Sequence, residues 1–125
     1  MKRILGLLLT TICTLVGCQA DEIKFQSVDV ATFAAIIKDS NVVLLDLRTI
    51  SEYQQGHIPS AILIDVTQSD FMQRAKEQLP TEKTIALYCR SGRRSKTAAQ
   101  LLSKEHYNVV ELNTGFNSWT GEVEK

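Results

Sequence analysis

Short apolar segments alternate with segments of helical spacing along most of this 125-residue chain, and this alternation restricts its fold more than any other feature. Nearly continuous apolar runs are typical of strands that are covered on both faces. The expected strands are residues 23–26, 42–47, 62–64, 84–88 and 108–112. One expected helix begins after the capping residue Asp29, and three others cover 51–55, 69–79 and 93–105. The sequence therefore predicts an α/β fold, with a parallel β-sheet and helices on both of its faces.

Length and composition restrict the number of domains and the classes of partner. Hydrophobic residues make up 44% of the chain, as expected for one compact domain. The 14 lysines and arginines balance the 14 aspartates and glutamates, so the chain has no overall field that attracts nucleic acid. Its histidines and cysteines do not have the spacing of a metal site. We therefore expect no nucleic-acid partner, no metal and no cofactor.

The N-terminal segment has the pattern of an export signal. Lys2 and Arg3 precede an apolar run, residues 4–16, that carries no charge. At about 13 residues this run is shorter than the roughly 20 that a membrane-spanning helix needs. The string LVGC at residues 15–18 resembles the lipobox of bacterial lipoproteins, in which the cysteine is lipidated and becomes the new N-terminus. A plain signal peptide cut near Ala20 is the alternative.

The lipobox resemblance implies an exported lipoprotein that faces the periplasm or the cell exterior. Lipid on Cys18 would anchor the mature chain to a membrane. Cys13 would be lost with the signal peptide, which leaves Cys89 without a cysteine partner. An unpaired cysteine in an exported protein indicates a reactive thiol or an intermolecular pairing, whereas a buried and unreactive cysteine is the alternative.

The segment CRSGRRS, residues 89–95, favours the reactive interpretation of Cys89. It follows an expected buried strand and leads into an expected helix, so backbone N–H groups without partners can converge on an anion there. Gly92 permits the backbone conformations that such a loop needs. This setting lowers the pKa of a cysteine and activates it as a nucleophile. The predicted substrate-binding residues are Arg90, Ser91, Gly92, Arg93, Arg94 and Ser95.

Three separated motifs between Val28 and Trp119 resemble those of single-domain rhodaneses, the thiosulfate sulfurtransferase family. LLDLRTISEYQQGHIPSAILI at residues 44–64 is similar to the first signature of that family. CRSGRRS is similar to its active-site loop, and ELNTGFNSW at residues 111–119 to its closing signature. Two departures concern turns: Ser60 stands where glycine is usual, and Thr114 replaces the first glycine of a common pair.

The resemblance implies a rhodanese-like domain at residues 28–125, after a lipoprotein signal peptide at 1–17 and an N-terminal tether with the first strand at 18–27. It also implies that Cys89 takes the outer sulfur of a donor such as thiosulfate and holds it as a persulfide. A thiol or a cyanide-like acceptor would then remove this sulfur. The arginines of the loop would steer the anionic donor, and the loop N–H groups would bind the persulfide sulfur.

Two other functions remain open on the sequence alone. The first is a persulfide carrier or thiol-binding module that needs a partner protein. The second is a phosphatase or arsenate-reductase-like enzyme, because tyrosine phosphatases use a cysteine, five residues and then an arginine. Here Ser95 occupies the sixth position after Cys89, and Arg94 comes one residue early. The loop is therefore expected to suit a single sulfur atom better than a tetrahedral oxyanion.

Four residues outside the loop are given structural roles. Asp46 is expected to brace a turn, and Arg48 to pair with Glu52 at helical spacing. Trp119 is expected to pack the C-terminal turn onto the core.

Overall fold

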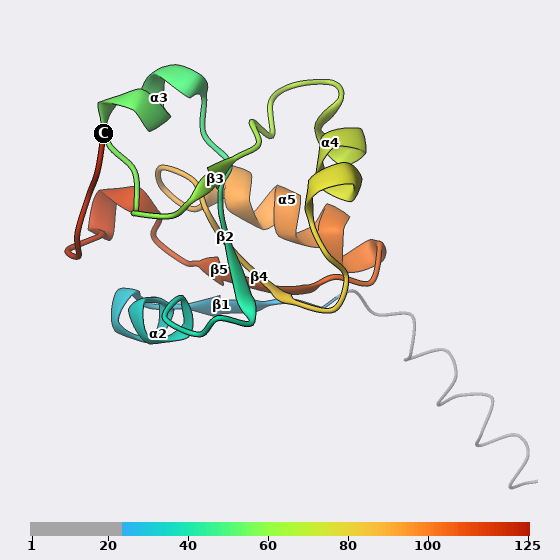
Figure 1. The fold of residues 1–125 in the computed structure, drawn as a ribbon, viewed down its shortest axis with the longest axis horizontal. Coiled ribbons are helices and arrows are strands. Elements are labelled where there is room, and N and C mark those ends of the chain that lie inside the picture. Colours follow the sequence, from blue (N-terminus) through green and yellow to red (C-terminus); the bar gives the residue numbers. More distant parts are fainter. Residues whose placement is uncertain (1–23) are drawn as a thin grey trace, which may run out of the picture.

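A five-stranded parallel sheet forms the centre of the computed structural model, which describes residues 24–125. The strand order is β1-β5-β4-β2-β3, and every pairing is parallel (Figure 1). The strands are β1 (Gln26–Val28), β2 (Val42–Asp46), β3 (Ile62–Leu63), β4 (Thr84–Tyr88) and β5 (Asn108–Leu112). The helices are α2 (Val30–Ile36), α3 (Ile50–Gln55), α4 (Phe71–Gln78), α5 (Arg93–Lys104) and the 3-10 turn η1 (Phe116–Ser118).

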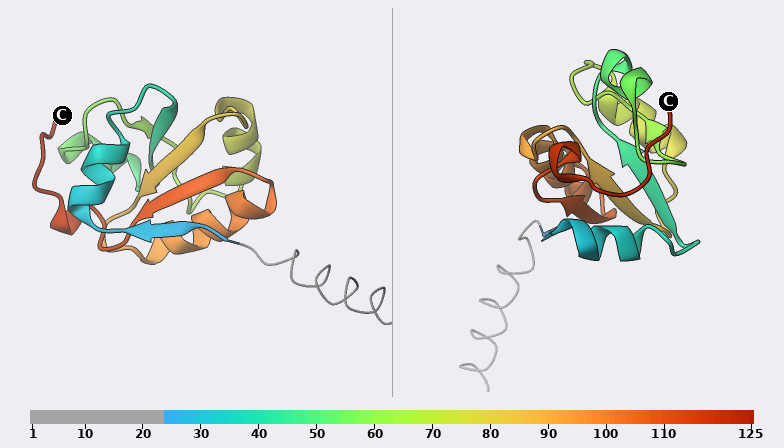
Figure 2. Two further views of the ribbon diagram at one scale, coloured as in Figure 1. Left: turned by 90° about the horizontal axis from the view of Figure 1, so that it is seen from below. Right: turned by 90° about the vertical axis from the view of Figure 1, so that its left-hand side faces the viewer.

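Helices cover both faces of the sheet, as the sequence predicted. Figure 1 shows α2 on one side of the strands and α4 and α5 on the other. Figure 2 shows the strands β1, β5 and β4 side by side with their arrowheads pointing the same way. The prediction of an α/β fold with a parallel sheet is therefore confirmed. No helix within residues 24–125 combines the length and the apolar character that a bilayer crossing needs.

The first strand is the element whose predicted position was wrong. It was expected at residues 23–26, and the structure has β1 at Gln26–Val28. Two neighbours fix the later position: β1 pairs in register with residues 110–112 of β5, and Asp29 begins α2 by accepting a hydrogen bond from Thr32 N at 2.9 Å. The expected signal segment and Cys18 lie outside the described residues.

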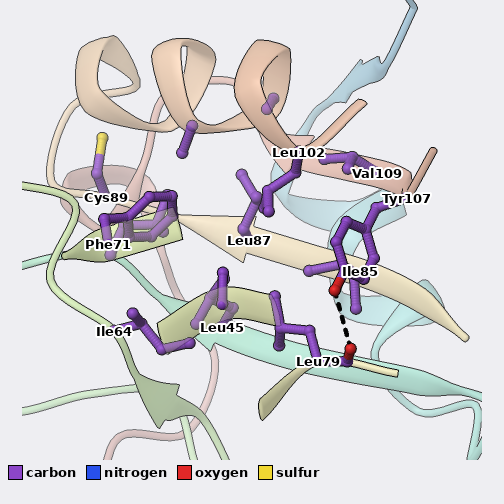
Figure 3. Packing of buried hydrophobic residues seen from close by; sticks show 14 residues of the cluster. Leu45, Ile64, Phe71, Leu79, Ile85, Leu87, Cys89, Leu102, Tyr107 and Val109 are labelled. Carbon is purple, nitrogen blue, oxygen red and sulfur yellow. Dashed lines mark hydrogen bonds between the residues drawn. The ribbon is translucent and has the colours of Figure 1, made fainter. Parts of the chain in front are cut away.

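The period of two along each strand divides the buried side chains into two clusters. One cluster lies under α4 and α5 and contains Leu45, Leu87 and Val109; Figure 3 shows it with Cys89 at its margin. The other lies under α2 and η1 and contains Phe33 and Tyr88, among others. Trp119 packs edge-on against Phe33, with ring centroids 6.4 Å apart, so its predicted packing role is confirmed.

The loops that follow the central strands meet at the carboxyl edge of the sheet. Phe116 N donates a hydrogen bond of 2.8 Å to the carbonyl oxygen of Cys89, and Asn117 N donates one of 3.0 Å to that of Arg90. Gly115 has a φ of 71°, and a Cβ added there would lie 2.4 Å from Arg90 O. Glycine is therefore required where the turn after β5 supports the loop after β4.

Candidate active site

The loop after β4 closes around the sulfur atom of Cys89. Gly92 N lies 3.1 Å from Cys89 Sγ and Ser95 N lies 3.3 Å from it, and both N–H groups donate to the sulfur. Gly92 has a φ of 102°, and a Cβ on it would lie 2.1 Å from Asn113 O. The turn that brings the two N–H groups onto one atom therefore depends on glycine at this position.

The surroundings of Cys89 favour its thiolate form. Burial raises the pKa of the Cys89 thiol, because the residue is only 1% exposed. Hydrogen bonding from Ser95 and from the N–H groups of Gly92 and Ser91 outweighs this effect, so the pKa lies below the usual thiol value. In Figure 3 the sulfur points away from the Phe71 ring and toward α5. This arrangement can stabilise an anionic sulfur without an adjacent base.

The three arginines of the loop have different surroundings. Arg94 makes a bidentate ion pair with Glu52, with Nη1–Oε1 and Nη2–Oε2 distances of 2.9 and 3.0 Å. The Arg90 side chain is 64% exposed and its Nη1 lies 3.7 Å from Glu52 Oε2. Arg93 is exposed at the first position of α5. Arg90 and Arg93 are therefore more available to a ligand than Arg94.

Glu52 lies near the loop and was expected to pair with Arg48. The expected Arg48–Glu52 pair is wrong, because Arg48 pairs instead with Asp46, with Nη2 2.7 Å from Oδ2. The Arg94 hydrogen bonds, together with those of Thr49, lower the pKa of Glu52 to about 2 despite its partial burial. Spacing of four residues on one helix was the signal for the expected pair, and Arg48 precedes α3 rather than lying on it.

Two more residues near the loop were not anticipated as part of the site. Glu111, on β5, is fully buried and accepts a hydrogen bond of 2.5 Å from Ser95 Oγ. Lys96 Nζ lies 3.0 Å from Glu111 Oε1 and also donates to Gly92 O and Asn113 O. The available signal was a glutamate after the apolar residues of an expected strand, at the first position of the closing motif.

A cavity of about 330 Å³ opens beside the loop. Its lining includes the side chains of Glu52 and Arg90 and, from η1, Phe116 and Asn117. The guanidinium group of Arg48 lies over the Phe116 ring, 4.3 Å from its centroid, which fixes one wall. The cavity combines charged and aromatic walls next to the loop that surrounds Cys89 Sγ.

Comparison with known proteins agrees with this geometry. The family model of the rhodanese-like domain matches residues 29–122. This chain belongs to the rhodanese-like domain family. A sulfurtransferase of Allochromatium vinosum is 32% identical over 80 residues, which are 63% of this chain and 72% of that protein. The crystal structure of a rhodanese-related protein from Thermoplasma volcanium superposes with a TM-score of 0.72 at 28% identity, covering 80% of this chain and 98% of the other.

A second relative differs in overall length. The Bacillus subtilis protein YrkF, whose name describes it as a sulfur carrier, is 32% identical over 87 residues, or 69% of this chain. The match covers only 45% of YrkF. The names of these rhodanese-like relatives support a general role in sulfur transfer.

Proposed function

We propose that this protein is a sulfurtransferase in which Cys89 carries the transferred sulfur as a persulfide. The observation that supports this most directly is the pair of N–H groups, from Gly92 and Ser95, that donate to Cys89 Sγ at 3.1 and 3.3 Å. Such donors stabilise both the attacking thiolate and the anionic terminal sulfur of a persulfide. The rhodanese-like family and the sulfur-related names of its relatives support the same reaction class.

The proposed cycle has two steps. The Cys89 thiolate attacks the outer sulfur of a thiosulfate-like donor, a new S–S bond forms, and sulfite leaves with the electron pair of the bond that breaks. A nucleophilic acceptor, such as a thiol or cyanide, then attacks the terminal sulfur and releases the thiolate. This is covalent catalysis with ping-pong kinetics.

Mass spectrometry of residues 24–125 before and after thiosulfate treatment tests the first step. We expect a gain of one sulfur atom that maps to Cys89, and no gain in Cys89→Ser, whose hydroxyl has no base beside it. Cys89→Ser should also lose all transfer from thiosulfate to cyanide while its circular dichroism stays unchanged. Substantial residual turnover would contradict the role of Cys89 as the nucleophile.

Donor steering is assigned to the exposed arginines of the loop. Arg90→Ala and Arg93→Ala should each raise KM for thiosulfate about fivefold, equivalent to about 1 kcal/mol for an exposed charge, with little change in kcat. Arg94 is held by Glu52 and is expected to contribute less to KM. Unchanged KM in both exposed variants would mean that the donor binds elsewhere.

A persulfide carrier is the second candidate, supported by the sulfur-carrier name of YrkF. A carrier would accept one sulfur per Cys89 but would turn over slowly with small acceptors. The ratio of thiocyanate formed to protein present separates the two: many equivalents indicate an enzyme, and about one indicates a carrier that needs a partner protein.

Membrane anchoring through Cys18 is a further part of the proposal, supported by the LVGC string at residues 15–18. Export as a lipoprotein would place the domain in the periplasm or at the cell exterior. Labelled fatty acid should appear on the full chain and not on Cys18→Ser, and two acyl chains should keep the protein in the membrane fraction after a salt wash. Label on the Cys18→Ser variant would refute the attachment site.

A further inference from the structure

Glu111 is a fully buried acid on the face of the sheet that α5 covers. Its neighbours in register are Leu87 on β4 and Ser27 on β1. Two residues earlier on the same strand, Val109 belongs to the apolar cluster under α4 and α5. An acid in such a position costs free energy unless hydrogen-bond donors compensate it, so its contacts need an explanation.

Three donors surround the Glu111 carboxylate. Ser27 Oγ and Lys96 Nζ donate to Oε1, the latter at 3.0 Å, and Ser95 Oγ donates to Oε2 at 2.5 Å. Lys96 and Ser95 both lie in the first turn of α5, directly after the sulfur-binding loop. The carboxylate therefore contacts the same turn that supplies N–H groups to Cys89.

The hydroxyl of Ser95 has one proton and two acceptors within hydrogen-bond distance, and the residue also contacts the Cys89 sulfur through its backbone N–H. Gly92 O lies 3.0 Å from Ser95 Oγ and Glu111 Oε2 lies 2.5 Å from it, while the backbone N–H of the same residue donates to Cys89 Sγ at 3.3 Å. A carboxylate oxygen is a stronger acceptor than a carbonyl oxygen or a sulfur atom. The hydroxyl is therefore drawn to Glu111, and the hydrogen bonds to Cys89 Sγ come from the backbone N–H groups of Gly92 and Ser95.

We propose that Glu111 is a positioning residue for sulfur transfer, which draws the Ser95 hydroxyl away from the Cys89 sulfur and so prevents excessive stabilisation of the thiolate. This inference rests on the proposed role of Cys89 as the sulfur carrier. Its chemical reason is that the nucleophilicity of a thiolate falls as its pKa falls, with a Brønsted coefficient of about 0.4–0.5. A thiol that is too acidic is fully ionised but attacks sulfur slowly.

The charged side chains near Cys89 and Glu111 include Lys96, Arg94 and Glu52. Lys96 faces Glu111, and Arg94 lies directly before Ser95 in the first turn of α5. Arg94 is itself paired with Glu52 of α3. A substitution that leaves these three residues in place therefore isolates the effect of Glu111.

Glu111→Gln is the substitution that tests the proposal, because it keeps the shape of the side chain and removes its charge. We expect the midpoint of the Cys89 thiolate titration, followed by ultraviolet absorbance against Cys89→Ser, to fall by about one pH unit. The limiting rate with methyl methanethiosulfonate at high pH should fall about threefold. Loosening of the structure alone would instead expose the sulfur and raise this rate. Glu105→Gln, at the exposed end of α5, is the matched control and should leave both values unchanged.

Ser95→Ala decides whether the hydroxyl carries the effect. Alone it should move the midpoint by much less than one pH unit, and combined with Glu111→Gln it should remove at least half of the downward shift. If Glu111→Gln lowers the Cys89 titration midpoint equally with and without the Ser95 hydroxyl, the proposal is overturned. Direct charge repulsion between Glu111 and the thiolate would then explain the shift. An unchanged midpoint in Glu111→Gln would also overturn the proposal.

The Ser95→Ala variant tests the proposal even if Glu111→Gln does not fold. If Glu111→Gln does not fold, a rise of a full pH unit in Ser95→Ala alone would show that the hydroxyl already serves the sulfur, and would also overturn the proposal. Neither the titration nor the thiosulfonate reaction needs a sulfur donor. Failure of persulfide formation with thiosulfate would therefore count against the proposed function and not against the role of Glu111.

Discussion

Asp46 and Glu111 are both 0% exposed and both lie at the carboxyl ends of strands, yet the two acids have different surroundings. Asp46 lies on the face of the sheet that α2 covers, and its partners are the buried side chains of Arg48 and Tyr88. Glu111 lies on the opposite face, and its cation is Lys96, which is 45% exposed. Asp46 therefore has buried charged and tyrosine partners. Glu111 contacts the first turn of α5 through Ser95 and has a cation, Lys96, that reaches solvent.

The contacts of Asp46 explain its enclosure. Tyr88 Oη donates to Asp46 Oδ2 at 2.6 Å and accepts from Ile58 N at 3.1 Å. Arg48 Nη2 donates to both Asp46 Oδ2 and Gly56 O, each at 2.7 Å. This group ties β2 and β4 to the segment between α3 and β3. We call Asp46, Arg48 and Tyr88 the Asp46 group and infer that it maintains the fold. Glu111, by contrast, is proposed to act on the loop around Cys89 through Ser95.

The largest expected loss of the free energy of unfolding is that of Asp46→Ala. Asp46→Ala leaves the buried guanidinium group of Arg48 without its partner, which costs about 3–5 kcal/mol of the free energy of unfolding. Glu111→Gln should cost only about 1 kcal/mol, because Lys96 can reach water. Urea unfolding of the two variants measures both values. Equal losses of the free energy of unfolding in the two variants would contradict the difference between the two acids.

Tyr88→Phe is the next largest change and affects the Asp46 group without changing its charge. Burial, with the nearby Asp46 charge, raises the pKa of Tyr88, so the hydroxyl stays protonated and donates. Its removal leaves Asp46 and Ile58 N each with one bond fewer and should cost about 1–3 kcal/mol. The Cys89 titration midpoint should stay at the parent value. A shifted midpoint would mean that the Asp46 group also acts on the site.

Glu52→Gln concerns the contact between α3 and the loop around Cys89. The pKa of Glu52 is lowered from 4.5 to about 2, chiefly by Arg94, so the ionised form stabilises the fold above pH 4.5. This contribution is lost as the pH falls toward 2, and it amounts to about 1–2 kcal/mol because the pair is partly exposed. Acid unfolding should show the loss in the parent and not in Glu52→Gln. Parallel curves for the two proteins would contradict the assignment.

The sequence predicted the sheet and the loop around Cys89 because each depends on local patterns. The strands at residues 84–88 and 108–112 are apolar runs between clear helix signals, and both were placed correctly. The CRSGRRS motif identified Cys89 and the N–H groups near it. The loop geometry follows from Gly92 and from the start of α5, which lie within a few residues of Cys89.

Contacts between distant segments could not be predicted in the same way. Glu52 and Arg94 are 42 residues apart, and Ser27 and Glu111 are 84 apart. These pairs depend on the order of the strands in the sheet, which the alternation of strands and helices leaves open. The Arg48–Glu52 pair was predicted from spacing alone, and the stronger attraction of Arg48 to the buried Asp46 carboxylate prevailed.

Ser60 should give the smallest effect and tests how the Asp46 group holds the segment before β3. The residue has a φ of 73°, in the left-handed region that favours glycine. Ser60→Gly relieves this strain, and the greater freedom of glycine in the unfolded chain offsets part of the gain. We expect the free energy of unfolding to rise by about 0.5 kcal/mol in urea. In the Tyr88→Phe background the gain should be smaller, because a segment released from Tyr88 can relax by itself. An equal gain in both backgrounds would show that the Asp46 group does not impose the conformation of Ser60.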